Sequence, residues 1–402
     1  MTATAAAAAP AKALDAPLTF DSAEKLIRLL TDGLVSIEES KGEFMTKIAN
    51  GPGFIDQKGW RAWEWTQGIA ISALWKHYSL SPESNVHSLN TLLDWFRYQY
   101  KATDGKGTSK NINTMAPFYG LACAVEAGAV PEDEKEQWIG WLDEWAEWIM
   151  NDLPRTEQGG FQHITFKSDH VQNIWDDTLM MTIIPLVKIG RLLNRPHYID
   201  EAIFQIMLHI EYLMEPKTGL WYHGWEFTPE KGPLQKGHNF VDALWARGNA
   251  WITLSLPIFL SITELPPTDP TYRILVSTLQ RQVDALVATQ DPETGLWHTL
   301  LVDPTSYVET SASAGFAAGI MMALSQGILE GEQYLACAKK AVDGIVAQIR
   351  PNGEVDNVSF GTGADCESLQ HYKDIPITPM PYGQALAMWT IVEWEKLQAT
   401  SA

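Results

Sequence analysis

The chain has 402 residues, 46% of them hydrophobic and 10% aromatic, a composition typical of a soluble globular protein with a large core. Its formal net charge of −20 argues against nucleic acid and anionic membrane surfaces as partners, although a locally basic site would still admit a small anionic ligand. No apolar run reaches the roughly 18 residues that a membrane-spanning helix needs.

The first stretch of the chain predicts no regular structure. Residues 1–17 are expected to form a disordered tail, because Met1 to Ala11 is rich in alanine and lacks the basic start and strongly apolar centre of a signal peptide. Residues 18–398 are expected to form one domain. Cys123, Cys337 and Cys366 show no metal-binding spacing, so we expect no metal and a reducing, cytoplasmic location.

After the tail, the chain predicts one helix after another, beginning with Phe20 to Ser36. The clearest is Glu134 to Met150, where Trp138, Trp141 and Trp145 share one apolar stripe opposite an acidic face. At this helical spacing the Trp stripe is predicted to pack on the core and not to bind a ligand. β-type alternation is scarce, and no region predicts a sheet.

Six helical segments share a small, apolar, Gly- and Ala-containing character with few charges. They recur roughly every 50 to 70 residues, with amphipathic helices between them, which predicts two concentric rings. We therefore expect an all-α, single-domain (α/α)6 barrel, a toroid of six helical hairpins. The six segments begin near Gln67, Met115, Asp177, Arg247, Ser311 and Tyr382.

The mouth of such a barrel is the predicted site. All inner helices run in the same direction, so their N-termini and the loops that precede them converge at one end. Trp faces that stack on sugar rings, together with polar groups that bind hydroxyls, predict a carbohydrate cleft there. The candidates are Trp60, Trp63, Glu64, Trp65, Asn111, Asn113, Thr114, Trp175, Asp176, Asp177, His238, Trp245, Arg247, Glu309, Ser311, His371, Tyr372 and Tyr382.

Several runs in this region carry a family resemblance. They are Trp175 to Thr182, His223-Gly224-Trp225, His238-Asn239-Phe240, Trp245 to Trp251 and Asp374 to Gln384. In this order and at these spacings the set resembles glycoside hydrolase family 105, which contains unsaturated rhamnogalacturonyl and related unsaturated glucuronyl hydrolases. The match extends from about Trp60 to Trp389. It implies an (α/α)6 barrel, in agreement with the repeat pattern.

The resemblance also implies a reaction and its residues. Such enzymes remove a 4,5-unsaturated uronic acid from the non-reducing end of lyase-generated oligosaccharides by hydrating its C4=C5 vinyl ether bond, without a cofactor. By resemblance, Asp177 is the general acid/base. His223, Trp245, Arg247 and Trp251 are substrate-binding residues, and Trp175, Lys167 and Asn113 match further cleft positions. The expected partner is a small anionic oligosaccharide, with the chain a monomer or a homodimer.

Plainer interpretations of these residues stay open at this point. Asp176 or Asp177 alone would be a common helix cap, and Arg247 would serve equally as an ion-pair partner or as a bidentate ligand of a uronate. The related family 88 carries an additional acid at the second inner helix, where this chain has Asn111 and Asn113, and this difference favours family 105. These amides are expected to bind sugar hydroxyls or to brace Asp177.

Two other classes of function also remain. One is an inverting (α/α)6 glycosidase of saturated sugars that uses Glu64 or Glu309 as a second acid. The other is a non-catalytic sugar-binding toroid.

Overall fold

A computed structural model describes residues 12–14, 16–39, 41–48, 53–232, 236–364 and 366–401. Most of the predicted N-terminal tail, residues 1–17, lies outside these ranges, so the disorder of that segment stays a prediction. Within the described ranges, no helix combines the length and the apolar character needed to cross a lipid bilayer.

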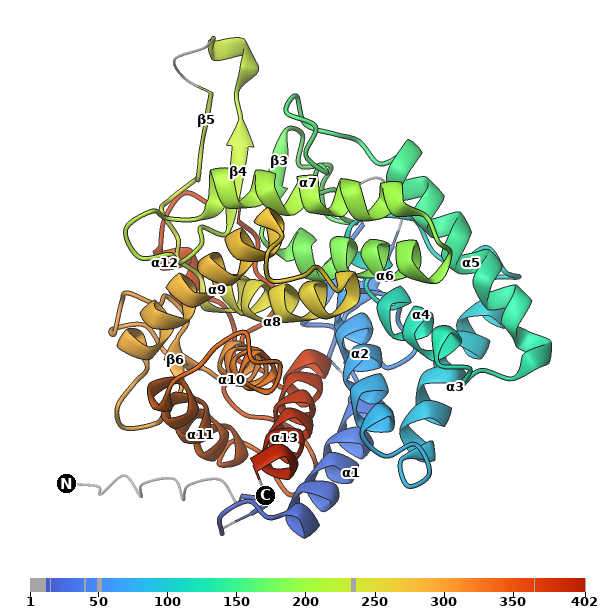
Figure 1. Cartoon of the computed structure of the whole chain (residues 1–402), viewed down its shortest axis with the longest axis vertical. Coiled ribbons are helices and arrows are strands. Elements are labelled where there is room, and N and C mark those ends of the chain that lie inside the picture. Colours follow the sequence, from blue (N-terminus) through green and yellow to red (C-terminus); the bar gives the residue numbers. More distant parts are fainter. Residues whose placement is uncertain are drawn as a thin grey trace.

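Two concentric rings of helices make up the body of the protein (Figure 1). The inner helices are α2 (Trp65–Leu80), α4 (Phe118–Glu126), α6 (Ile184–Leu192), α8 (Ala246–Thr263), α10 (Thr310–Ser325) and α13 (Pro381–Ser401). The outer helices are α1 (Phe20–Ser36), α3 (Val86–Ala102), α5 (Glu132–Asn151), α7 (Pro196–Leu213), α9 (Pro270–Thr289) and α11 (Glu332–Val346). Each inner helix contacts the next, and α13 returns to α2, which closes the ring. The predicted (α/α)6 barrel is confirmed.

Burial differs between the rings as the sequence pattern predicts. Every residue of α10 from Thr310 to Ala323 is buried, because other helices surround it. The outer helix α5 buries only one stripe, which includes Trp138, Trp141 and Trp145. Trp145 stacks on Trp63 with ring centroids 5.3 Å apart and an interplanar angle of 11°. The Trp stripe therefore packs on the core, as predicted.

The expectation that no region forms a sheet was wrong. Within the described ranges, short antiparallel strands form three small sheets, and the strands are too short for alternation to be visible in the sequence. They are β1 (Met45–Lys47) with β2 (Phe54–Asp56); β3 (Asn173–Trp175) with β4 (Gly224–Phe227) and β5 (Gly237–His238); and β6 (Trp297–His298) with β7 (Val308–Glu309). The segment of β4 and β5 projects from the helical body (Figure 1).

Shorter helical turns complete the description. They are η1 (Asn113–Met115), the π-helical turn η2 (Leu179–Ile183), η3 (Pro229–Lys231) and α12 (Gln370–Lys373).

The first helix closes the outer ring by packing on the last inner helix, α13, and on the turn that follows α11. A Cβ atom added to Gly33 of α1 would lie 2.5 Å from the carbonyl oxygen of Gly353. Gly353 has a φ of +80°, in the left-handed region that favours glycine. Two glycines thus allow the two backbones to touch.

We expect Gly33→Ala to lower the melting temperature, although alanine is the better helix former by about 1 kcal/mol. The added methyl group would force the two backbones apart, at a cost of about 1–3 kcal/mol or more. Gly140→Ala, in α5, is the matched control because a Cβ there meets nothing within 4 Å. It should raise the melting temperature. Stabilisation by both substitutions would contradict the close contact.

Candidate active site

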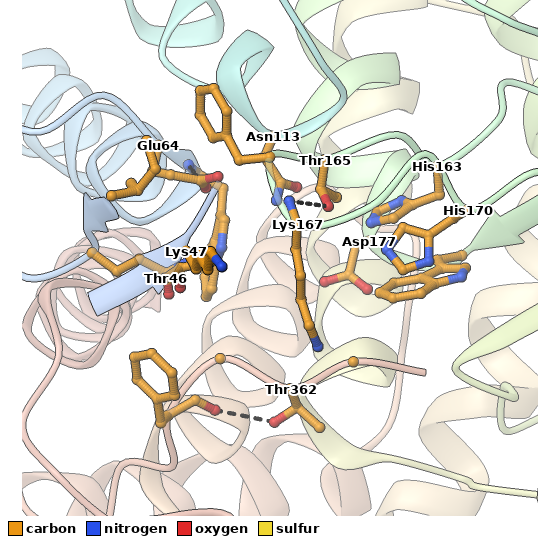
Figure 2. A pocket seen from close by; sticks show the side chains of 18 of the residues that line it. Thr46, Lys47, Glu64, Asn113, His163, Thr165, Lys167, His170, Asp177 and Thr362 are labelled. Carbon is orange, nitrogen blue, oxygen red and sulfur yellow. Dashed lines mark hydrogen bonds between the residues drawn. The ribbon is translucent and has the colours of Figure 1, made fainter. Parts of the chain in front are cut away.

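A cavity of about 350 Å³ lies at the N-terminal ends of the inner helices. Residues that precede α2, α4, α6 and α8 line it, together with the hairpin of β1 and β2 and the segment Phe360 to Gly363. In Figure 2, Glu64 and Lys47 lie on one side of the cavity, and Asp177, His163 and His170 lie on the other. The converging helix starts therefore form the predicted mouth.

Asp177 lies between the end of strand β3 and the start of the turn η2, and two nitrogen atoms contact its carboxylate. Trp251 Nε1 donates to Oδ1 at 3.1 Å, and His223 Nε2 lies 3.2 Å from Oδ2. Burial is the largest single influence and raises the pKa of Asp177, but neighbouring groups, led by the hydrogen bond and charge of His223, together outweigh it, so the pKa lies below its usual value. The side chain still reaches the cavity.

His223 connects Asp177 to the last repeat of the barrel. Its Nδ1 lies 2.9 Å from the hydroxyl of Tyr372, which belongs to α12. The Trp245 ring lies against the imidazole with centroids 4.2 Å apart. The backbone N–H of Asp176 donates to the carbonyl of His223 at 3.0 Å, which fixes the two segments together. His223 and Trp251 are almost fully buried, so both contact Asp177 from behind the cavity wall.

Two histidines outside the motifs of the family resemblance form the wall beside Asp177. His163 stacks on Trp175 with centroids 4.3 Å apart and an angle of 13°, and His170 packs on the same ring at 4.4 Å. Burial lowers the pKa of His163 well below its usual value, so this ring is neutral at pH 7. The signal for His163 in the sequence is that the run Gln158 to His163 is a weak copy of two later turns, Lys217 to Tyr222 and Glu293 to His298.

The opposite wall begins with the N-cap of α2. Glu64 accepts the backbone N–H of Trp65 at 2.7 Å and contacts the Asn113 side chain. Burial raises the pKa of Glu64 to about 7. Trp65 stacks on Tyr382 with centroids 4.6 Å apart. Asn113 lines the cavity and contacts the second acid, Glu64, rather than Asp177.

Of the two cations that the sequence indicated, Lys167 lines the cavity and Arg247 does not. Among the described residues that line it, Lys47 and Lys167 carry positive charge, and no acid in the described ranges forms an ion pair with either. In Figure 2 Lys167 extends across the cavity between Asn113 and Thr362.

Arg247 lies behind the wall, 1% exposed, and its guanidinium meets protein acceptors. It donates to Ser359 Oγ at 2.7 Å, to the Ser359 carbonyl at 3.1 Å and to the Phe360 carbonyl at 2.9 Å. Glu309 Oε1 lies 3.4 Å away. The expectation that Arg247 binds the substrate directly therefore needs correction, because this geometry leaves the guanidinium no open face toward the cavity. Arg247 supports the segment Phe360 to Gly363.

Other predicted candidates also lie outside the cavity. Glu309 is fully buried, caps α10 through the Ala312 N–H and pairs with Arg247. His238 lies on the projecting strand β5 with half of its side chain exposed. These placements remove Glu309 as a partner acid for Asp177.

Asp176, Asp177 and His223 bring one ligand-type atom each within 4.8 Å of one another. We interpret this cluster as a group of mutually contacting side chains and not as a metal centre, because Trp251 Nε1 donates to one oxygen of Asp177, His223 Nε2 lies 3.2 Å from the other, and Asp176 is fully enclosed.

Comparison with known proteins places the chain among glycoside hydrolases. It belongs to Glycosyl Hydrolase Family 88, whose model matches residues 36–398. The chain is 30% identical over 331 residues to the unsaturated rhamnogalacturonyl hydrolase YesR of Bacillus subtilis, which covers 81% of this chain and 88% of that protein.

Solved structures agree with the sequence comparisons. A possible member of glycoside hydrolase family 105 from Salmonella enterica serovar Paratyphi A is 43% identical, covers 96% of each chain and superposes with a TM-score of 0.88. An unsaturated glucuronyl hydrolase from Bacillus sp. GL1 is 19% identical with a TM-score of 0.65, covering 94% of this chain and 97% of that chain, and shows the shared fold. The resemblance to family 105 and its relatives is confirmed.

Replacing Arg247 with Met should destabilise the protein by about 3–5 kcal/mol, because Glu309 would be left as a buried, unpaired charge. Glu309→Gln should also destabilise it. The double variant should recover part of the loss, since neither charge then remains, and chemical denaturation of all four proteins measures this coupling. Strictly additive losses would show that the pair does not interact.

Proposed function

We propose that this glycosidase removes a 4,5-unsaturated uronic acid from the non-reducing end of short oligosaccharides by hydrating the C4=C5 bond. The observation that supports this most is the position of Asp177, a single carboxylate held by His223 and Trp251 at an aromatic cavity wall. The names of the relatives, which include unsaturated rhamnogalacturonyl and 3S-rhamnoglycuronyl hydrolases, favour the same substrate class.

In the proposed reaction, Asp177 acts at the double bond and not at the glycosidic oxygen. A proton from its carboxyl adds to C4, and the ring oxygen stabilises the positive charge that develops at C5. Water then adds to C5, and the carboxylate takes the proton that this water loses. The resulting hemiketal opens and releases the aglycone. The reaction contains no redox step, so no cofactor is proposed.

The geometry gives less support to a displacement glycosidase acting on saturated sugars. That mechanism needs two carboxyl groups that face each other across the bond that is cleaved. Glu309 is engaged by Arg247 and Ser311. Glu64 lines the cavity, but it caps α2 and contacts Asn113, so we assign it to sugar binding.

We further propose that Lys167, together with Lys47, binds the anionic groups of the substrate. Both ammonium groups belong to the cavity lining and form no ion pair within the described residues. In a protein of net charge −20, such cations attract an anion locally. We also propose that residues 18–398 act as one catalytic domain in the cytoplasm, as a monomer or a homodimer.

Asp177→Asn should lower kcat by about 10²- to 10⁴-fold, since one carboxylate supplies both proton transfers. The fold should be unchanged by circular dichroism. Turnover is followed as loss of the ultraviolet absorbance of the conjugated acid in lyase-made disaccharides. A variant that keeps most of the wild-type rate would remove Asp177 from this role.

The route of the reaction is tested with the wild-type enzyme in D₂O. Hydration places deuterium at C4, and H₂¹⁸O labels the ketone oxygen derived from C5 after correction for exchange. Saturated oligogalacturonides should not react. Absence of deuterium at C4, or rapid cleavage of saturated sugars, would refute hydration.

Lys167→Met should lower kcat/KM for the free acid by roughly tenfold, because a charge-assisted contact with the carboxylate is lost. The methyl ester of the same substrate should lose much less. Lys25→Met, on the exposed face of α1, is the control. If acid and ester lose activity equally, Lys167 does not bind the carboxylate.

A further inference from the structure

Asp176, the neighbour of Asp177, has a carboxyl group in an unusual position. The residue is 0% exposed, and no side-chain N–H or hydroxyl group of the described residues donates a hydrogen bond to its carboxyl oxygens. The side chain that it contacts is the carboxyl group of Asp177. Gly248 at the start of α8 encloses it, since a Cβ there would lie 2.2 Å from Oδ2. Two carboxyl groups therefore meet with no side-chain donor between them among the described residues.

Electrostatics requires a proton at this contact. A buried carboxylate without a cation is costly, and two adjacent carboxylates cannot both ionise without strong repulsion. Burial, followed by the charge of Asp177, raises the pKa of Asp176 well above its usual value. The titratable groups that face the pair are His223 beside β4, neutral His163 before β3 and Tyr372 of α12. The donors from His223 and Trp251 reach Asp177, so Asp176 carries the proton at rest.

The proposed reaction makes this proton important. Asp177 must donate a proton to C4 near neutral pH, yet its hydrogen-bond donors stabilise its anion. We propose that Asp176 stores the proton that Asp177 delivers, so that the active enzyme is the pair of carboxyl groups with one shared proton. This inference rests on the proposed hydration. Asp176 acts through Asp177 and does not touch the substrate, because it is fully enclosed.

The step balances without any further reactant. The proton moves from Asp176 to Asp177 and from Asp177 to C4, while the two π electrons of C4=C5 form the new C–H bond. The positive charge at C5 and on the ring oxygen then faces the deprotonated pair. Water adds to C5, and the proton that it loses returns to the pair, which restores the starting state.

Asp176→Asn tests the proposal, because the amide keeps the shape and an N–H donor toward Asp177 but has no proton to deliver. The alkaline limb of kcat/KM against pH, which reports groups of the free enzyme, should move to lower pH by at least about one unit. Activity at pH 7 should therefore fall about tenfold or more. It should recover as the pH is lowered toward 5, because Asp177 must then take its proton from solvent. Loss of a structural contact would lower the rate equally at every pH.

Glu393→Gln is the matched control, since Glu393 of α13 is also a buried acid, 1% exposed. It lies near Lys76 of α2. Its pH profile should have the wild-type shape. An Asp176→Asn profile with the wild-type shape, or a uniform loss at all pH values, would overturn the proposal.

The wild-type profile gives a second test that needs no variant. If the pair stores a proton, kcat/KM should stay level through neutral pH and decline only above it. A tenfold decline per pH unit that already begins near pH 5 would show that Asp177 works alone and would refute the stored proton. If the wild-type enzyme consumes no unsaturated disaccharide at any pH, the proposed function fails instead.

Discussion

Close contact between the inner helices is the constraint on which the rest of the structure depends. A Cβ on Gly68 of α2 would lie 2.5 Å from the Cβ of Ala116, and a Cβ on Gly319 of α10 would lie 2.4 Å from the Thr253 carbonyl oxygen of α8. Such spacing allows six helices to close a narrow ring with their N-termini at one end. The helix dipoles then place partial positive charge around one mouth. A strongly acidic chain thereby obtains an end that is suited to an anionic ligand.

The same constraint explains why residues from different repeats contact the carboxylate of Asp177. The barrel interior is apolar, so polar groups at its mouth must satisfy one another. Asp177 precedes α6, Trp251 lies on α8, His223 precedes β4 and Tyr372 comes from α12 near the end of the chain. Their hydrogen bonds connect segments that are far apart in sequence. The site is therefore complete only when the ring is closed.

Much of this architecture was predictable because its signals are long and periodic. Six apolar segments marked the inner ring, and the start of each marked the mouth. The strands were not predictable, since strands such as Trp297–His298 have no room for alternation. His163 and His170 were missed as site residues because their contacts with Trp175 depend on tertiary folding. A single histidine in a loop sequence does not indicate which side chains it will contact in the folded protein.

Arg247 and the aspartate pair show where residue type stops being informative. Arg247 has the chemistry to bind a uronate, but its guanidinium already donates hydrogen bonds to the segment that begins at Ser359, 112 residues later. Asp176 and Asp177 are identical in type and adjacent in sequence. Their environments differ because the fold turns one carboxyl toward His223 and Trp251 and the other against Gly248. A sequence motif can thus identify the pair, whereas only the fold decides which carboxyl faces the cavity and which one is enclosed.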